Sequence, residues 1–512
     1  MCEKLLASHG EEGRAVHGLV RIKVDQVVLA RAPNRVLATA LSEGLQRSQV
    51  EVSVAYPPRC ILGPADAEPG IPEAVAPEAL DLGFLVAQPG AGFAAPMHLE
   101  RFGSPGRVLL TDEPRLAGSG AAAMLCLPAS QGQLSEALRT GQALIRPPRS
   151  VQIQLTGRLR PFVCVRDVAL DLMRRGLREV VQMVDAEHGA PVVLEFTGPS
   201  ARYLSVADRA VLCAVAPRLG AAAALFASDE KTESFLRDQR RSKAQRALAP
   251  DPGACWDEML SLDLAAVDPL LLDEEGRIRP VRDLDGRPVA QVLLGGDTGV
   301  TLRDLLAAAT LLKSKRVPPG VHFLLAPPSR QMLEVLARDG ALLDLISTGA
   351  RLVEPDRRVL SGDLYPVRST DGCALYSADP EFSAPAARGL VASAETLAYA
   401  VAHGVVGDPR LFKRPVRVTL PRDLPTDDVL LSRGAEQRGG AKGKGRVDKK
   451  AGREGGPPNG EQFGARMAPA SWNGDARLAL LRSRARPSQP SALLTERSED
   501  VQWLAEHAAD TP

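Results

Sequence analysis

Short apolar or alternating segments recur along the first four-fifths of the chain, separated by stretches with helical periodicity. The apolar segments predict strands at Val20–Ala30, Arg107–Leu110, Val151–Leu155, Val192–Phe196, Gln291–Leu294 and Val321–Leu325. Helical periodicity predicts helices at Ser205–Leu219, Leu302–Leu312 and Gln331–Leu336. Strands that alternate with helices are typical of an α/β architecture with largely parallel sheets.

Each predicted helix follows a residue that can cap its first turn. Ser205 is followed three positions later by Asp208, and Thr301 by Asp304, which is the spacing of a capping box. Ser329 precedes the third helix. These start signals support the helices independently of their hydrophobic periodicity.

Composition shifts divide the chain into predicted units. Breaks around Pro147–Arg149, Ala249–Ala254 and Asp273–Arg287 indicate linkers. We expect α/β domains at residues 1–148, 149–288 and 289–412. The remaining segment, 413–512, is rich in Gly, Lys and Arg, and we expect it to be largely disordered. Its positive charge is open to two interpretations, a solvated spacer or a tether for an acidic partner.

Bulk composition excludes several classes of protein. The 512 residues carry a net charge of +1, so no general attraction to nucleic acid or to an anionic membrane is expected. We find neither a signal-peptide pattern nor a long apolar run. The seven cysteines are scattered without a C-x-x-C pair, as in reduced thiols of a cytoplasmic protein.

One long segment resembles a known family. Val192–Leu236 matches a characteristic motif of the large subunits of aconitases and 3-isopropylmalate dehydratases. The matching residues are Glu195, Phe196, Thr197, Gly198, Pro199, Leu204, Ser205, Arg209, Asp229, Glu230 and Thr232. Shorter matches continue in the same order from Met1 to Arg410. The resemblance implies three α/β domains around a central cleft.

The resemblance also implies a chemistry. In that family an open iron of a [4Fe-4S] cluster acts as a Lewis acid on a hydroxy acid, a serine takes a proton, and arginines hold the carboxylates. The large subunit works with a separate small, swivelling subunit, so such a partner is expected here too. A small carboxylate metabolite is the expected ligand class.

The three cluster-binding cysteines of that family are replaced in this chain. Their positions are occupied by Asp297, Arg357 and Leu360. A guanidinium cannot ligate iron, and clusters are held by cysteine sulfur. The sequence therefore predicts a protein without a cluster and without the family's catalysis, serving as a carboxylate-binding protein or a scaffold.

Several residues remain candidates for the cleft. Ser377 is in register with the family's serine base, and the expected cleft residues are Asp112, Asp297, Arg357 and Arg358. Asp297 and Arg357 are predicted to form an ion pair in the space of the cluster.

Three alternatives stay open. In the first, the cluster is held by substitute ligands, namely Cys60, Cys126 and Cys373. In the second, the chain is an active hydro-lyase whose metal is held through oxygen by Asp112, Asp297 and Asp356. In the third, the chain is a binding module that acts through its basic tail. His98-Leu99-Glu100 is expected to be a surface element rather than a metal site.

Overall fold

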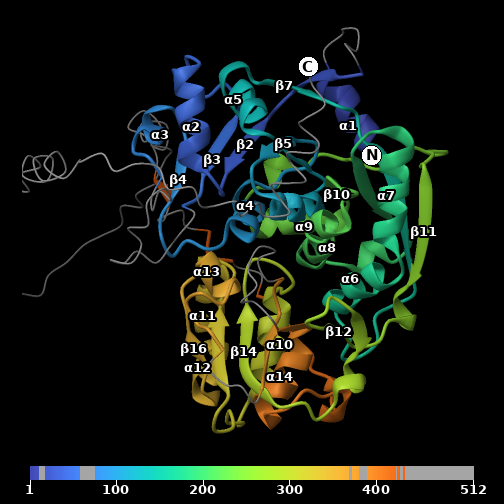
Figure 1. The fold of residues 1–512 in the computed structure, drawn as a ribbon, viewed down its shortest axis with the longest axis vertical. Helices are drawn as coiled ribbons and strands as arrows, with labels where there is room; N and C mark the ends of the chain where they lie inside the picture. Colours follow the sequence, from blue (N-terminus) through green and yellow to red (C-terminus); the bar gives the residue numbers. More distant parts are fainter. Residues whose placement is uncertain are drawn as a thin grey trace, which may run out of the picture.

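Three mixed α/β units make up the body of the protein (Figure 1). The computed structural model describes residues 1–10, 18–57, 75–367, 372–379, 389–421, 424–426 and 431–432. Within these ranges, no helix is both long and apolar enough to cross a bilayer. The α/β architecture expected from the sequence is therefore confirmed.

The first unit is built on a sheet of six strands that are parallel except at one edge. Their order is β19 (Leu431–Ser432), β4 (Leu85–Ala87), β3 (Val52–Ala55), β2 (Gln26–Leu29), β5 (Val108–Thr111) and β6 (Leu125–Pro128). The antiparallel edge strand β19 comes from beyond the third unit and pairs with β4. The helices are α1 (Cys2–His9), α2 (Pro33–Ser42), α3 (Glu78–Asp81), α4 (Ala94–Phe102) and α5 (Gln131–Thr140).

The second unit has a fully parallel sheet. Its strand order is β10 (Ala223–Phe226), β9 (Val192–Thr197), β8 (Arg149–Thr156) and β11 (Glu258–Asp263). Its helices are α6 (Val165–Arg174), α7 (Leu177–His188), α8 (Val206–Cys213) and α9 (Glu230–Asp238). Parallel strands buried on both faces are rich in apolar residues, as β10 is throughout and β9 is apart from Glu195 and Thr197.

The third unit has a mixed seven-stranded sheet. Its strand order is β13 (Ile278–Pro280), β12 (Leu270–Leu272), β18 (Leu390–Ala392), β17 (Cys373–Tyr376), β14 (Val289–Gly295), β15 (His322–Ala326) and β16 (Arg351–Leu352). Its helices are α10 (Leu302–Leu312), α11 (Arg330–Arg338), α12 (Ala341–Thr348), α13 (Arg357–Leu360) and α14 (Ala394–His403). Strands β12 and β13 lie within residues 149–288, yet they pair into this third sheet; the domain bounds themselves stay a prediction.

Two predicted elements differ in the structure. The expected strand Val20–Ala30 is split into β1 (Val20–Lys23), which pairs with β7 (Gln142–Ile145), and β2. The break falls at Asp25, whose buried carboxylate accepts the backbone N–H of Val108. The expected helix Ser205–Leu219 ends at Cys213 and resumes as a 3₁₀ turn, η4 (Ala216–Leu219), because Pro217 cannot continue an α-helix.

The predicted helix starts are confirmed. Capping boxes join Ser205 with Asp208 and Thr301 with Asp304, and Ser329 accepts the backbone N–H of Met332. Of the expected tail, residues 413–421, 424–426 and 431–432 are described, and the carbonyl of Pro425 accepts hydrogen bonds from Arg101 and Gln331. Its expected disorder falls on residues outside the described ranges.

A close backbone approach packs the first unit on the second. The 3₁₀ segment η2 (Pro114–Ala122) lies against β10, and a Cβ added at Gly120 would lie 1.7 Å from the carbonyl oxygen of Ala224. We expect Gly120→Ala to lower the free energy of unfolding by about 2 kcal/mol, because backbone on both sides must shift. Urea unfolding measures the change.

Gly132 in α5 gives a matched control for that substitution. Nothing lies within 4 Å of a Cβ added there. Gly132→Ala should raise the free energy of unfolding by roughly 0.5–1 kcal/mol, because alanine loses less backbone entropy in a helix. Equal effects of the two substitutions would show that the contact of Gly120 with β10 is not tight.

Candidate functional site

The polar centre of the molecule lies beyond the carboxyl ends of two neighbouring parallel strands. Asp297 and Thr298 follow β14, and Ser377 and Asp379 follow β17. The arrowhead of β14 in Figure 1 is directed toward the first unit, so this edge of the sheet faces the other two units. The carboxyl edge of a parallel sheet is the usual place for a ligand site in α/β proteins.

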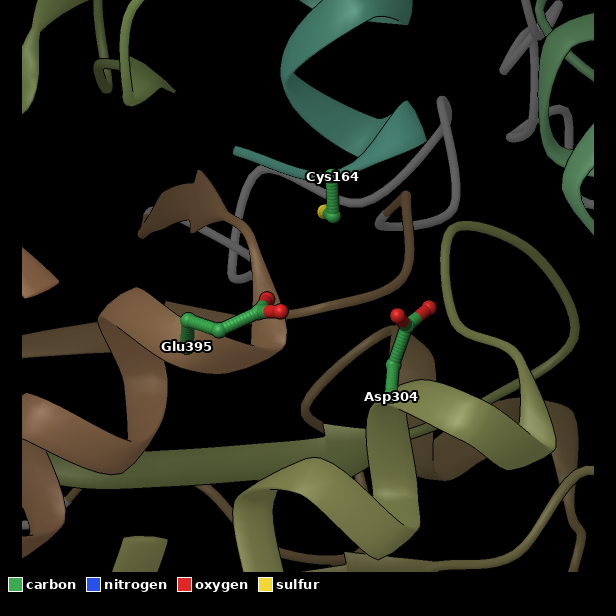
Figure 2. Close-up of side chains that lie close together, drawn as sticks. All are labelled: Cys164, Asp304 and Glu395. Atoms are coloured by element: carbon green, nitrogen blue, oxygen red, sulfur yellow. The ribbon is translucent and has the colours of Figure 1, made fainter. Parts of the chain in front are cut away.

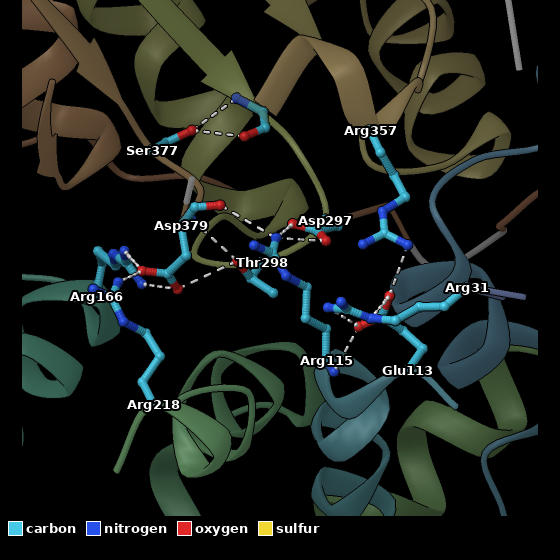
Figure 3. Close-up of polar contacts among 11 residues, drawn as sticks. Arg31, Glu113, Arg115, Arg166, Arg218, Asp297, Thr298, Arg357, Ser377 and Asp379 are labelled. Carbon is cyan, nitrogen blue, oxygen red and sulfur yellow. Dashed lines mark hydrogen bonds and ion pairs between the residues drawn. The ribbon is translucent and has the colours of Figure 1, made fainter. Parts of the chain in front are cut away.

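Asp379 is the most heavily paired carboxylate of this centre. It accepts hydrogen bonds from both Nη atoms of Arg166 at 3.0 and 2.6 Å and also pairs with Arg218 (Figure 3). Burial alone would raise the pKa of Asp379, but Arg166 and Arg218 outweigh it and hold that pKa far below its ordinary value. The carboxylate is therefore fixed in its charged form.

Arg115 joins the first unit to the third. It extends from η2, and its Nη1 lies 2.7 Å from each carboxylate oxygen of Asp297. The same nitrogen donates to the carbonyl of Asp379 at 3.2 Å. Both Arg115 and Asp297 are largely withdrawn from solvent, with side chains 4% and 8% exposed. Asp297 thus contributes an ion pair between units.

Glu113 forms a second charged cluster beside the first. Its carboxylate pairs with Arg31 at 3.3 Å and with Arg357 at 3.2 Å. Burial alone would raise the pKa of Glu113, but Arg31, Arg357 and Arg115 lower it to about 2. The structure pairs Asp297 with Arg115 and Arg357 with Glu113, and the expected ion pair of Asp297 with Arg357 stays a prediction.

Two expected cleft residues have local structural roles. The carboxylate of Asp112 accepts the backbone N–H groups of Ala30, Arg31 and Ala32 before α2. Arg358 donates from Nε and Nη2 to Asp356, each at 3.1 Å, and Asp356 also caps α13. Asp112, Asp297 and Asp356 therefore have separate partners. Among the described residues, these three aspartates do not come close enough together to share a metal ion.

Ser377 is fully buried, and its hydroxyl bridges the end of β14. It accepts the backbone N–H of Gly295 at 2.8 Å and donates to the carbonyl oxygen of Gly295 at 2.9 Å. Both interactions fix the backbone from which Asp297 extends. These two hydrogen bonds explain why a serine occupies this position without any catalytic role for its hydroxyl.

The third position matched to a cluster cysteine, Leu360, is buried in an apolar cluster with Phe93, Leu324 and Tyr376. Beside it, the space lined by Asp297, Arg357, Arg115 and Glu113 has a volume of about 30 Å³. A volume of that size holds about one water molecule.

Two of the three proposed substitute cysteines lie elsewhere. Cys373 is the first residue of β17, and its thiol donates to the carbonyl oxygen of Pro288. The site begins at Ser377, just beyond the other end of this strand. At 3.3 Å per residue, Ser377 lies about 13 Å from Cys373. Cys126 is buried within β6 in the core of the first unit. Cys60 is outside the described residues.

A larger cavity of about 240 Å³ opens beside Arg115, Asp297 and Thr298. Its wall is mostly apolar and includes Leu420 and Leu424 of the segment after the third unit. Glu100 also lines it and accepts a hydrogen bond from Ser329 at 2.7 Å. The expectation that His98-Leu99-Glu100 lies on the surface is wrong, because His98 and Glu100 are buried and His98 contacts Gln26.

Glu100 should make stability depend on pH near neutrality. Burial raises its pKa to about 7, against the lowering effect of Ser329, Arg101 and Arg241. Because the folded state holds the proton more tightly, stability falls as pH rises from about 4.5 to about 7. We expect Glu100→Gln to raise the free energy of unfolding at pH 8 by roughly 3 kcal/mol and by little at pH 4. Urea unfolding at both pH values tests this, and a gain of equal size at both would contradict it.

Sequence reasoning missed Asp379, Arg166 and Arg218 as members of the site. Arg166 lies in the segment Val165–Val168, and Asp379 lies two residues after Ser377, so both fell within segments that resembled family motifs. The charges of Asp379, Arg166 and Arg218 within or near these motifs were the only sign in the sequence that they could belong to the site. Their pairing was not predictable, because it joins residues more than 160 positions apart.

Comparison with known proteins places these features in a family. Residues 76–275 match the Aconitase family (aconitate hydratase). The chain is 30% identical over 321 residues to 3-isopropylmalate dehydratase large subunit 2 of Methanopyrus kandleri, covering 61% of this chain and 73% of that protein. It is 24% identical over 374 residues to the large subunit of Elusimicrobium minutum, covering 69% and 84%.

A solved structure is also similar, the holo-form of aconitase X from Thermococcus kodakaraensis, with 10% identity, a TM-score of 0.40 and coverage of 81% of this chain and 95% of that one. The sequence matches carry the assignment. The chain belongs to the aconitase family, and within it to the relatives of 3-isopropylmalate dehydratase large subunits.

Proposed function

We propose that this chain is a cluster-free member of its family that binds a small carboxylate and does not catalyse the hydro-lyase reaction. The observation that carries the proposal is the ion pair of Arg115 with Asp297, beside the buried Leu360. Asp297 and Leu360 take two of the three positions at which the resemblance implies cysteines, and Arg357 takes the other.

The donor chemistry does not suit an iron–sulfur cluster. Clusters need thiolates, whereas the three positions offer a carboxylate already paired with a guanidinium, a second guanidinium and an aliphatic side chain. The space of about 30 Å³ that Asp297 and Arg357 line is too small for a cage of four irons and four sulfurs. No described cysteine lines that space.

The charges favour an anion as the ligand. Five arginines gather at this centre, and Glu113, Asp297 and Asp379 pair with them. Guanidinium groups are the side chains best suited to hold a carboxylate through paired hydrogen bonds. The neighbouring cavity has mostly apolar walls, with Arg115 and Lys231 as cations and Glu100, Asp238 and Asp297 as acids in its lining. A carboxylate with a branched alkyl group, such as 3-isopropylmalate, suits that combination of a cationic end and apolar walls.

Two measurements test the proposal on protein purified without oxygen. We expect neither stoichiometric iron nor acid-labile sulfide, and no conversion of 3-isopropylmalate or citrate. We expect 3-isopropylmalate to raise the melting temperature, because it binds the folded state. Bound sulfide in stoichiometric amount, or turnover by the chain, would refute the loss of catalysis.

Arg357→Gln is the informative variant for ligand binding, because Arg357 lines the space beside Asp297 and is 25% exposed. It should abolish the thermal shift. Arg338→Gln is the matched control, because Arg338 pairs with Glu334 on the exposed side of α11. A ligand shift that both variants keep would rule out binding at the arginine network.

A separate small subunit is a second part of the proposal. The relatives are named large subunits, a name that implies a smaller partner. Co-expression with a small subunit of the family, followed by affinity capture and gel filtration, should yield a stable complex. Separate elution of the two chains at micromolar concentration would contradict it.

A further inference from the structure

Three potential metal ligands converge where the second unit meets the third. Cys164 is the residue before α6, Asp304 lies in the first turn of α10, and Glu395 lies in the first turn of α14. One ligand atom from each lies within 4.8 Å of the other two. Figure 2 shows the thiol and both carboxyl groups directed toward a common space.

Two oxygens of this group are buried without a hydrogen-bond partner. Glu395 Oε2 and Asp304 Oδ1 have no hydrogen bond, although Glu395 is 7% exposed and Asp304 1% exposed. The other oxygen of Asp304 accepts from the backbone and hydroxyl of Thr301. Leaving a buried carboxylate oxygen unpaired is costly, so these oxygens point to a missing partner.

The geometry points to a zinc-type divalent cation held by Cys164, Asp304 and Glu395. A thiolate with two carboxylates suits a borderline-soft ion such as Zn²⁺, whereas Mg²⁺ and Ca²⁺ take oxygen ligands alone. Zinc sites commonly use three protein ligands and a water. A bound cation would occupy the space between the two unpaired oxygens and tie α6 to α10 and α14.

The surrounding charges are compatible with a cation. Asp167 and Asp208 add negative potential at Glu395 and Asp304, respectively. Arg303 is the opposing charge, but its Nη1 lies 3.7 Å from Asp304 Oδ1, beyond hydrogen-bond distance.

Solvent reaches this position from a neighbouring cavity. Glu395 and Arg303 line a space of about 610 Å³ together with Val163 and Val165, the residues on either side of Cys164. A hydrated ion can therefore approach from that side, and a water can complete the coordination. The three ligands are separate from the residues around Asp379, so the result for iron and sulfide leaves this inference untouched.

Cobalt substitution of the full chain tests the site. After removal of metal by a chelator, Co²⁺ should bind in a single equivalent and produce the charge-transfer absorbance of a thiolate–cobalt bond. Cys164→Ser should abolish that band and weaken Zn²⁺ binding by at least about 100-fold, more than loss of an outer-shell partner would. Glu395→Gln should weaken Zn²⁺ binding by at least about 10-fold.

Cys255→Ser is the matched control, because Cys255 is the exposed thiol among the described cysteines. It should leave the band and the affinity unchanged. Glu395→Gln keeps the test valid if Cys164→Ser does not fold. The inference is overturned if the folded wild type binds no stoichiometric Co²⁺, or if the thiolate band persists in Cys164→Ser or disappears in Cys255→Ser.

Discussion

Asp379→Asn is expected to lower the free energy of unfolding by about 3–5 kcal/mol. The substitution keeps the shape of the side chain but removes the charge that neutralises Arg166 and Arg218. The guanidinium of Arg166 is 1% exposed and makes both of its recorded hydrogen bonds to the carboxylate of Asp379. A buried cation that loses its counter-charge keeps its full desolvation cost. Urea unfolding monitored by circular dichroism measures the loss.

Asp251→Asn is the control for the same chemical change. Asp251 pairs with Lys4 at the surface, where its side chain is 67% exposed. An exposed pair of this kind contributes about 0–1 kcal/mol, so little change in stability is expected. Should the two variants lose similar amounts, the network around Asp379 would contribute no more than a surface ion pair.

Acid should destabilise the protein through Glu113. Its pKa in the folded state is about 2, against an ordinary value of 4.5. Because the unfolded chain binds the proton more tightly, this contribution is fully present above about pH 4.5 and is lost as pH falls toward about 2. The pKa difference corresponds to roughly 3 kcal/mol. Free energies of unfolding measured between pH 2 and pH 7 follow the loss.

Glu113→Gln separates this contribution from that of other carboxyl groups. The variant should be less stable than the wild type at pH 7, and the gap should close as pH falls from about 4.5 to about 2, where the wild-type carboxylate is protonated. A gap that stays constant over this range would mean that the charge of Glu113 does not stabilise the fold.

Much of the fold was predictable from local signals. The apolar runs at Val192–Phe196 and Gln291–Leu294 and the caps at Ser205 and Thr301 are local properties, and each marks an element of the structure. The split of Val20–Ala30 was not predictable in the same way. It depends on the burial of Asp25 against Val108, a contact that only the assembled sheet creates.

The location of the site residues was predictable from the sequence, but the residues with which they pair were not. Alignment with family motifs indicated that Asp297, Arg357 and Leu360 lie near one another, and Asp297 and Arg357 do line one space. The partners Arg115 and Glu113 come from the first unit, and the choice between several nearby charges depends on rotamers and burial that sequence spacing does not contain. The roles of Asp112 and Ser377 as backbone hydrogen-bonding residues were hidden for the same reason.

The pairing of β19 with β4 has a consequence for how the protein behaves in concentrated solution. Strand β4 would otherwise present unpaired N–H and C=O groups at the margin of the first sheet, and such margins template association between chains. The short returning strand shields part of that margin. Shortened versions that end before Leu431 would therefore be expected to self-associate more readily, even where their enclosed cores are intact.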